Sequence, residues 1–181
     1  LRSFETDFSR MATAICALIG LLLGSFLTVV VDRVPRGTSV VRPGSECGNC
    51  GLRLGPLDLV PLLSWLVLRG KCRRCRMSIG IEPVVLELST CLLFGLMGWH
   101  FGLTWRTAAF CVLMAGLVAL SWIDLLTHRL PREITYTTAA IGVPLLCVAA
   151  LVDNEPKRIW MLAAGAAIAL ATMALIYWVS R

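Results

Sequence analysis

Apolar stretches of similar length recur along the chain, separated by polar segments. Five of them run for 18 to 21 residues with few charges, at positions 11–31, 84–101, 107–126, 134–152 and 159–179. A helix needs roughly 20 predominantly apolar residues to cross a bilayer. The pattern therefore predicts an all-α, polytopic membrane protein with about five transmembrane helices. Because the last four stretches are joined by short connections, we expect neighbouring helices to run antiparallel.

One polar segment is far longer than an ordinary connection, and it separates the first stretch from the second. Within it, Leu57–Leu68 is mostly apolar, but it is too short to cross a bilayer and contains Pro61. We expect it to lie along the membrane interface or to pack against the helix bundle. The pattern thus divides the chain into a first transmembrane helix at 11–31, a loop at 32–83 and a four-helix transmembrane part at 84–181.

Composition and charge add an orientation to this picture. The chain is 57% hydrophobic, above the roughly 45–50% of soluble domains. Of its 17 Lys and Arg residues, nine lie between Asp32 and Glu82. Counted by side of the membrane, 12 lie on the side of this loop and five on the other. The positive-inside rule therefore places the loop in the cytoplasm, and the basic charge indicates membrane orientation instead of nucleic-acid binding.

The loop also holds the only patterned cysteines among the eight in the chain. Cys47 with Cys50 and Cys72 with Cys75 form two Cys-x-x-Cys pairs, with 21 residues between the pairs. Cytosolic thiols stay reduced, and four of them in two chelating pairs are typical of a tetrahedral zinc site. We expect a structural zinc that closes the loop without activating water; metal-free thiols or a redox pair are the alternative. The other four cysteines stand alone in apolar segments: Cys16, Cys91, Cys111 and Cys147.

Two acids are unusual for a membrane protein. Asp124 ends the apolar run of residues 108–123, seven residues before Pro131, and the predicted topology places it at the cytoplasmic boundary. A solvated helix-end acid that pairs with Arg129 is the plain interpretation. Glu87 lies early in the helix at 84–101, where the helix dipole stabilises a carboxylate.

Four stretches in a fixed order make the chain similar to a known family. They are Gly24–Leu27 followed by Arg33–Pro35; the first cysteine pair followed by Asp58–Trp65; Leu68–Cys75 leading through Pro83 to Glu87–Leu88; and Asp124 followed by Pro131. Over about residues 20–135 this arrangement resembles the prepilin peptidases, membrane aspartic proteases that process type IV pilin-like precursors.

The resemblance implies an endopeptidase that removes a short basic leader from a prepilin or pseudopilin at the cytoplasmic face of the bacterial inner membrane. Many members then methylate the new N-terminus, a reaction that would use S-adenosylmethionine. Catalysis would need two carboxylates that share a proton. Asp124 matches the first. The second carboxylate belongs to a Gly-x-Gly-Asp motif on a later helix. We expect this motif just beyond residue 181, and we therefore expect that this chain lacks its C-terminal part.

Other interpretations remain open beside this one. Two copies of the chain could each contribute Asp124, or Glu87 could serve as the second acid. The basic leader would be recognised by acids among Asp58, Glu82, Glu87 and Asp124. A protein of another class, a non-catalytic membrane zinc-ribbon assembly or adaptor protein, would need no second carboxylate at all.

Overall fold

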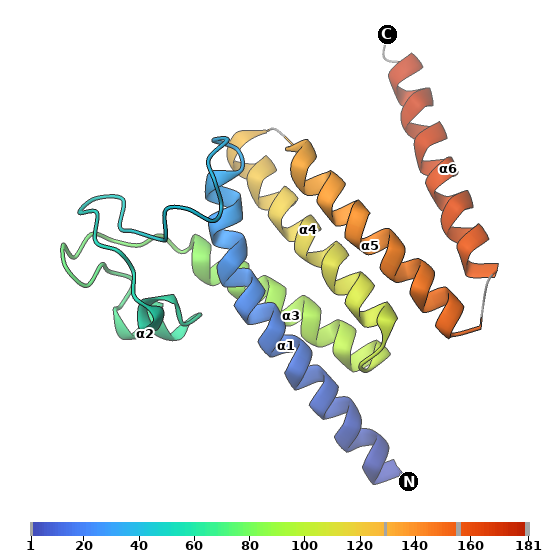
Figure 1. Cartoon of the computed structure of the whole chain (residues 1–181), viewed down its shortest axis with the longest axis horizontal. Coiled ribbons are helices and arrows are strands. Elements are labelled where there is room, and N and C mark those ends of the chain that lie inside the picture. The colour runs from blue at the N-terminus through green and yellow to red at the C-terminus, as the bar shows by residue number, and fades with distance from the viewer. Residues whose placement is uncertain (1, 129, 155–156, 180–181) are drawn as a thin grey trace.

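The computed structural model describes residues 2–128, 130–154 and 157–179, and its regular elements are helices. The long ones are α1 (Arg2–Arg33), α3 (Glu82–Phe101), α4 (Trp105–Thr127), α5 (Arg132–Val152) and α6 (Lys157–Val179), as Figure 1 shows. All five are long and apolar enough to cross a membrane, which confirms the predicted class. Their bounds agree with the predicted ones to within two residues, except that α1 begins at Arg2 instead of residue 11.

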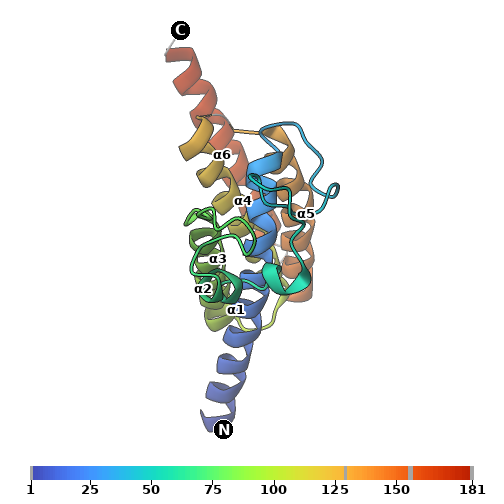
Figure 2. The ribbon, with the colours of Figure 1, turned by 90° about the vertical axis from the view of Figure 1, so that its left-hand side faces the viewer.

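The bundle is built on the pair α1 and α3, with α4 packed against both and α5 packed against α4. The loop between α1 and α3 contains a 3₁₀-helix, η1 (Pro56–Leu59), and a short helix, α2 (Leu63–Val67). In Figures 1 and 2 this loop lies beside α1 and α3, and α6 stands at the opposite side of the bundle, beyond α5. The described side chains of α6 are almost all exposed.

Glycines let α1 and α3 approach each other closely. A Cβ atom on Gly20 would lie 2.5 Å from the Thr90 carbonyl oxygen, and one on Gly24 would lie 2.6 Å from the Glu87 Cα. Gly98 on α3 likewise leaves room for α1, because a Cβ atom on it would lie 2.7 Å from the Ala12 carbonyl oxygen. Small residues spaced by four are a common way for membrane helices to pack, because no lipid-driven hydrophobic force pulls such helices together.

One end of the bundle carries a common core. It joins the last turns of α1 and α4 to the first turns of α3 and α5, which confirms the antiparallel order. Its buried side chains are Leu27, Val31, Leu86, Ala119, Ile123 and Ile134. The loop with its cysteines begins and ends at this end of the bundle, and Asp124 directly follows a residue of the core. The predicted site residues therefore share one end of the molecule.

The glycine contact predicts which substitution separates α1 from α3. Gly24→Leu places a side chain where the Thr90 side chain and the α3 backbone already lie, so the two helices must move apart. Overpacking of this kind costs roughly 1–3 kcal/mol or more. We expect a clear fall in the thermal unfolding midpoint in detergent, whereas Gly165→Leu, which enters open space on α6, should leave it unchanged. Equal midpoints for both variants would contradict the packing described here.

Candidate functional site

The first cysteine pair sits in a turn held by its own backbone. The Cys47 N–H donates to the Leu52 carbonyl at 2.9 Å, and the Gly51 N–H donates to the Cys47 carbonyl at 2.9 Å. Gly51, the residue after Cys50, has φ 64°, in the left-handed region that a glycine adopts without strain. The sequence Cys-Gly-Asn-Cys-Gly thus suits the turn that points both thiols the same way.

The second cysteine pair repeats this turn with the same hydrogen bonds. The Cys72 N–H donates to the Met77 carbonyl at 2.8 Å, and the Arg76 N–H donates to the Cys72 carbonyl at 3.1 Å. Arg76 takes the place of the glycine, with φ 58°. A non-glycine residue in this region costs about 1–2 kcal/mol, so the repeat of the turn is enforced by its surroundings and not by the preference of this residue.

The two turns bring the four sulfurs together. The Sγ atoms of Cys47 and Cys75 lie 3.7 Å apart, and those of Cys50 and Cys72 lie 3.9 Å apart. All four Sγ atoms lie within 4.8 Å of one another. A tetrahedral site with Zn–S bonds of about 2.3 Å has sulfur–sulfur distances of roughly 3.8 Å. The four-cysteine cluster predicted from the sequence is therefore confirmed as a group able to bind a metal.

The backbone around the cluster prepares some of the sulfurs as thiolates. The Met77 N–H, followed by the Asn49 side chain, lowers the pKa of Cys75 to about 6. The N–H of Leu52 acts in the same direction on Cys50, but burial and hydrogen bonds from the other sulfurs outweigh it and raise the pKa of Cys50 to about 11. Without metal at neutral pH, the cluster therefore holds thiolate and thiol together, and a metal ion must displace the remaining protons.

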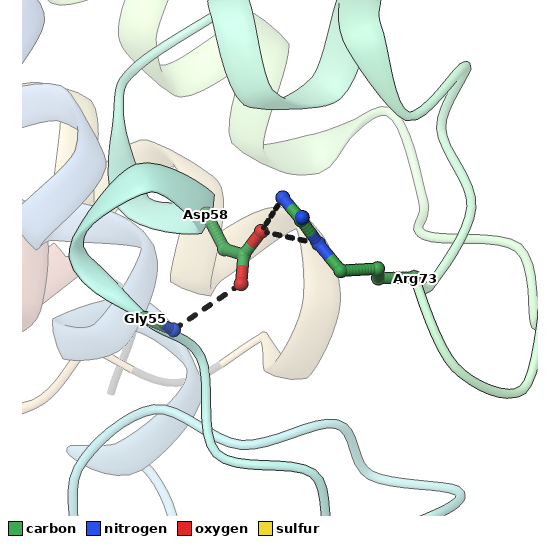
Figure 3. A network of polar contacts seen from close by, with 3 residues as sticks. All are labelled: Gly55, Asp58 and Arg73. Atoms are coloured by element: carbon green, nitrogen blue, oxygen red, sulfur yellow. Dashed lines mark hydrogen bonds and ion pairs between the residues drawn. The ribbon is translucent and has the colours of Figure 1, made fainter.

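Asp58 fastens η1 to the second cysteine turn. Its Oδ1 accepts hydrogen bonds from Arg73 Nη2 at 2.7 Å and Arg73 Nε at 3.2 Å, while Oδ2 accepts the Gly55 N–H at 3.2 Å (Figure 3). Only 12% of its side chain is exposed. Both carboxylate oxygens of Asp58 thus accept hydrogen bonds from other residues of the loop. Arg73 directly follows Cys72 in the sequence.

Glu87 is the point where the loop meets the bundle. Its side chain is buried in α3, and its Oε2 accepts the Leu62 N–H at 2.7 Å. The Ser25 hydroxyl of α1 also hydrogen-bonds to this carboxylate. Leu62 itself has φ 57°, an uncommon conformation for a leucine, at the N-cap of α2. Three of the four sequence stretches therefore converge here, through Gly24 and Ser25, Leu62, and Glu87.

A cavity of about 520 Å³ lies between the loop, α1 and α3. Its wall includes Ser25, Asp58, Trp65, Arg73 and Glu87. Sequence reasoning missed this cavity, because its walls come from separate segments whose contacts no local pattern reveals. The one sequence signal that could have indicated the cavity was that most of the four stretches named above lie in or next to the loop.

Asp124 lies apart from this cavity. Its side chain is exposed at the end of α4, and the adjacent Ile123 is buried in the common core. The Asp124 carbonyl accepts the His128 N–H at 2.9 Å, and His128, with φ 53°, ends the helix. The predicted alternative partner, Arg129, lies outside the described residues. The structure thus brings Asp58, Glu87, Cys47 and Cys72 to one cavity and leaves Asp124 on the nearby surface.

These features define a polytopic membrane protein whose long loop carries a four-cysteine metal-binding cluster. The family model "Bacterial Peptidase A24 N-terminal domain" matches residues 18–101, which include the cluster, Asp58 and Glu87 but not Asp124. The chain belongs to the prepilin leader peptidase/N-methyltransferase family.

Three relatives with the name "Prepilin leader peptidase/N-methyltransferase" illustrate the similarity. The Pseudomonas aeruginosa protein is 38% identical over 74% of this chain and 54% of the relative. The Stutzerimonas stutzeri protein is 31% identical over 94% of this chain and 66% of the relative, and the Myxococcus xanthus protein is 40% identical over 76% and 41%. The chain thus spans about half the length of the relatives it matches. No solved structure matches it.

The cluster geometry predicts one tightly held metal ion per chain. Cys75→Ser or Cys50→Ser removes one of four ligands and should abolish stoichiometric binding, measured as metal content after dialysis. Cys147→Ser, on α5 outside the cluster, is the matched control and should keep the ion.

The affinity of the cluster for metal should depend on pH. Cys75 loses its thiolate as the pH falls through about 6, and Cys50 must release a proton on binding at any pH below about 11. Affinity should therefore rise steadily from pH 5 to pH 8. An affinity independent of pH in this range would contradict thiolate coordination.

Proposed function

We propose that this chain acts as a prepilin leader peptidase, a membrane aspartic endopeptidase that removes the basic leader of a type IV prepilin or pseudopilin. The observation that carries the proposal is the family membership, together with an exposed Asp124 at the end of the bundle that also carries the loop. A bacterial member of the family is expected in the inner membrane. The charge count places both the loop and Asp124 on the cytoplasmic side.

Asp124 is the catalytic acid in this proposal. In an aspartic protease two nearby carboxylates cannot both ionise, so one acts as base on the attacking water while the other donates a proton to the substrate carbonyl or the leaving amine. Glu87 is a poor partner, because its carboxylate is buried and already accepts the Leu62 N–H. We propose that the second carboxylate is supplied instead by a Gly-x-Gly-Asp motif of the kind that the family resemblance implies, or by Asp124 of another copy.

The metal in the proposal is zinc, held by Cys47, Cys50, Cys72 and Cys75. Four thiolate ligands leave no open coordination position, so the ion would stabilise the loop and would not activate water. The residues present fit this ion, since the sulfur–sulfur distances match a tetrahedral thiolate site. The Asp58–Arg73 ion pair supports the same part of the loop.

Recognition of a basic leader needs acids that are accessible. The carboxylates of Asp58 and Glu87 are engaged by groups of the protein itself. Glu82, at the first turn of α3, and Asp124 are exposed. We therefore assign leader binding to Glu82 and Asp124, and assign Asp58 and Glu87 to positioning the loop.

The name of the relatives suggests N-methylation as a second activity, and the cavity beside Glu87 supports it. Its volume of about 520 Å³ lies within the roughly 300–1,000 Å³ of small-molecule sites. Trp65 in its wall offers an aromatic face to a cationic ligand. We propose that S-adenosylmethionine binds there; when bound, it supplies the methyl group.

The peptidase proposal predicts the effect of neutralising Asp124. In membranes that contain this chain and a pilin-type precursor, Asp124→Asn should reduce leader cleavage by at least about 100-fold, because proton transfer by such a group contributes this much or more. Asp32→Asn, which removes an exposed acid from the last turn of α1, is the matched control and should cleave normally. Cleavage is read from the size and new N-terminus of the product.

Two outcomes would contradict the peptidase proposal. Normal cleavage by Asp124→Asn would remove Asp124 from catalysis. A metal-loaded wild-type chain that binds the precursor but never cleaves it would favour the non-catalytic zinc-ribbon assembly or adaptor protein.

The methyl-donor proposal predicts binding without any precursor. Equilibrium dialysis with labelled S-adenosylmethionine should show one site per chain, and Trp65→Leu should weaken it by about tenfold through the loss of the aromatic face. Trp160→Leu, on the exposed surface of α6, should bind as the wild type does. Unchanged metal content would show that the loop of the Trp65 variant is still folded. Equal binding by both variants would contradict the assignment to this cavity.

A further inference from the structure

The short helix α2 presents an apolar face that the bundle does not cover. Leu63, Leu66 and Val67 are 60%, 62% and 78% exposed. Their spacing by three and four places them on one side of the helix. Leu57 of η1, which packs next to α2, is 77% exposed. We call these four side chains the α2 surface.

Two hydrogen bonds fix how deep α2 lies along the bundle. The Leu62 N–H donates to the carboxylate of Glu87. Glu87 lies five residues after the start of α3, which is about 7–8 Å along that helix. The Trp65 indole N–H donates to the Gly80 carbonyl at 3.2 Å, just before α3 begins. Because α3 is a candidate membrane span from Glu82 to Phe101, α2 lies level with the first turns of that span. In Figure 1 α2 lies outside the bundle, on the side where α3 begins.

The charges around α2 suit a lipid surface. Exposed cations follow the helix directly in the sequence: Arg69, Lys71, Arg74 and Arg76. Each Lys or Arg close to an anionic leaflet adds to the attraction between the two. Exposed apolar side chains at this depth, followed in the sequence by cations, are typical of a helix that lies in the interface.

We propose that α2 is an interfacial membrane anchor, whose surface inserts among anionic lipids and holds the four-cysteine cluster against the bilayer. Insertion would remove the four apolar side chains from water, which is favourable because it buries apolar surface. The anchor sets the height of the cluster and of the cavity beside Glu87 relative to the headgroups. The proposal does not depend on the peptidase activity.

Photocrosslinking in a defined bilayer tests the anchor. The whole chain, with p-benzoylphenylalanine in place of Leu66, is placed in nanodiscs of phosphatidylglycerol and phosphatidylcholine, and lipid adducts are measured by mass spectrometry. Leu92, 64% exposed on α3, is the lipid-facing reference, and Arg42, exposed in the polar part of the loop, is the reference for water. We expect a yield at Leu66 similar to that at Leu92 and about tenfold above that at Arg42.

A second position and a change of lipid complete the test. The probe in place of Val67 should behave as at Leu66, and metal content after dialysis shows whether each variant keeps its folded loop. Yields at both positions no higher than at Arg42 would overturn the proposal. Adducts to protein in place of lipid in native membranes would overturn it in favour of a protein partner. In discs of phosphatidylcholine alone the yield should fall; an unchanged yield would overturn the requirement for anionic lipid.

Discussion

One buried carboxylate ties the loop to the helix bundle. Glu87 has only 5% of its surface exposed, and a charge or polar group removed from water is costly unless donors surround it. The Leu62 N–H and the Ser25 hydroxyl supply those donors, one from the loop and one from α1. Gly24 leaves the space in which α1 and α3 come close enough for this to happen. The strained backbone of Leu62 persists because this contact holds it.

This contact explains what could and could not be predicted from the sequence. The five spans follow from apolar length, and the cluster follows from Cys-x-x-Cys, since both are local patterns. The convergence on Glu87 joins residues 25 and more positions apart, and no periodicity encodes it. The early start of α1 was missed for a different reason. Hydropathy detects where a helix enters the bilayer, whereas α1 also includes the polar sequence at residues 2–10 before that point.

The chemistry of the molecule is divided between two places at one end of the bundle. The loop, the cavity and Glu87 belong to the segment that the family model covers, whereas Asp124 follows on α4. The common core connects the two, because Leu86 precedes Glu87 and Ile123 precedes Asp124, and both pack in it. A shift of α4 against α3 would therefore change the distance between the two places without disturbing either. The packing of the common core therefore sets the distance between Asp124 and the loop with its cavity.

The repeated turn around the cysteine pairs bears on the order in which the loop assembles. Each turn is closed by hydrogen bonds between residues no more than five positions apart, so forming it closes only a very short stretch of chain. A sulfur pair presented by one preformed turn can capture an ion before the other turn arrives. The second pair then binds at the high local concentration set by the short tether between the turns. To complete the cluster, the loop thus has to bring two local turns together across the 21 residues that separate the cysteine pairs.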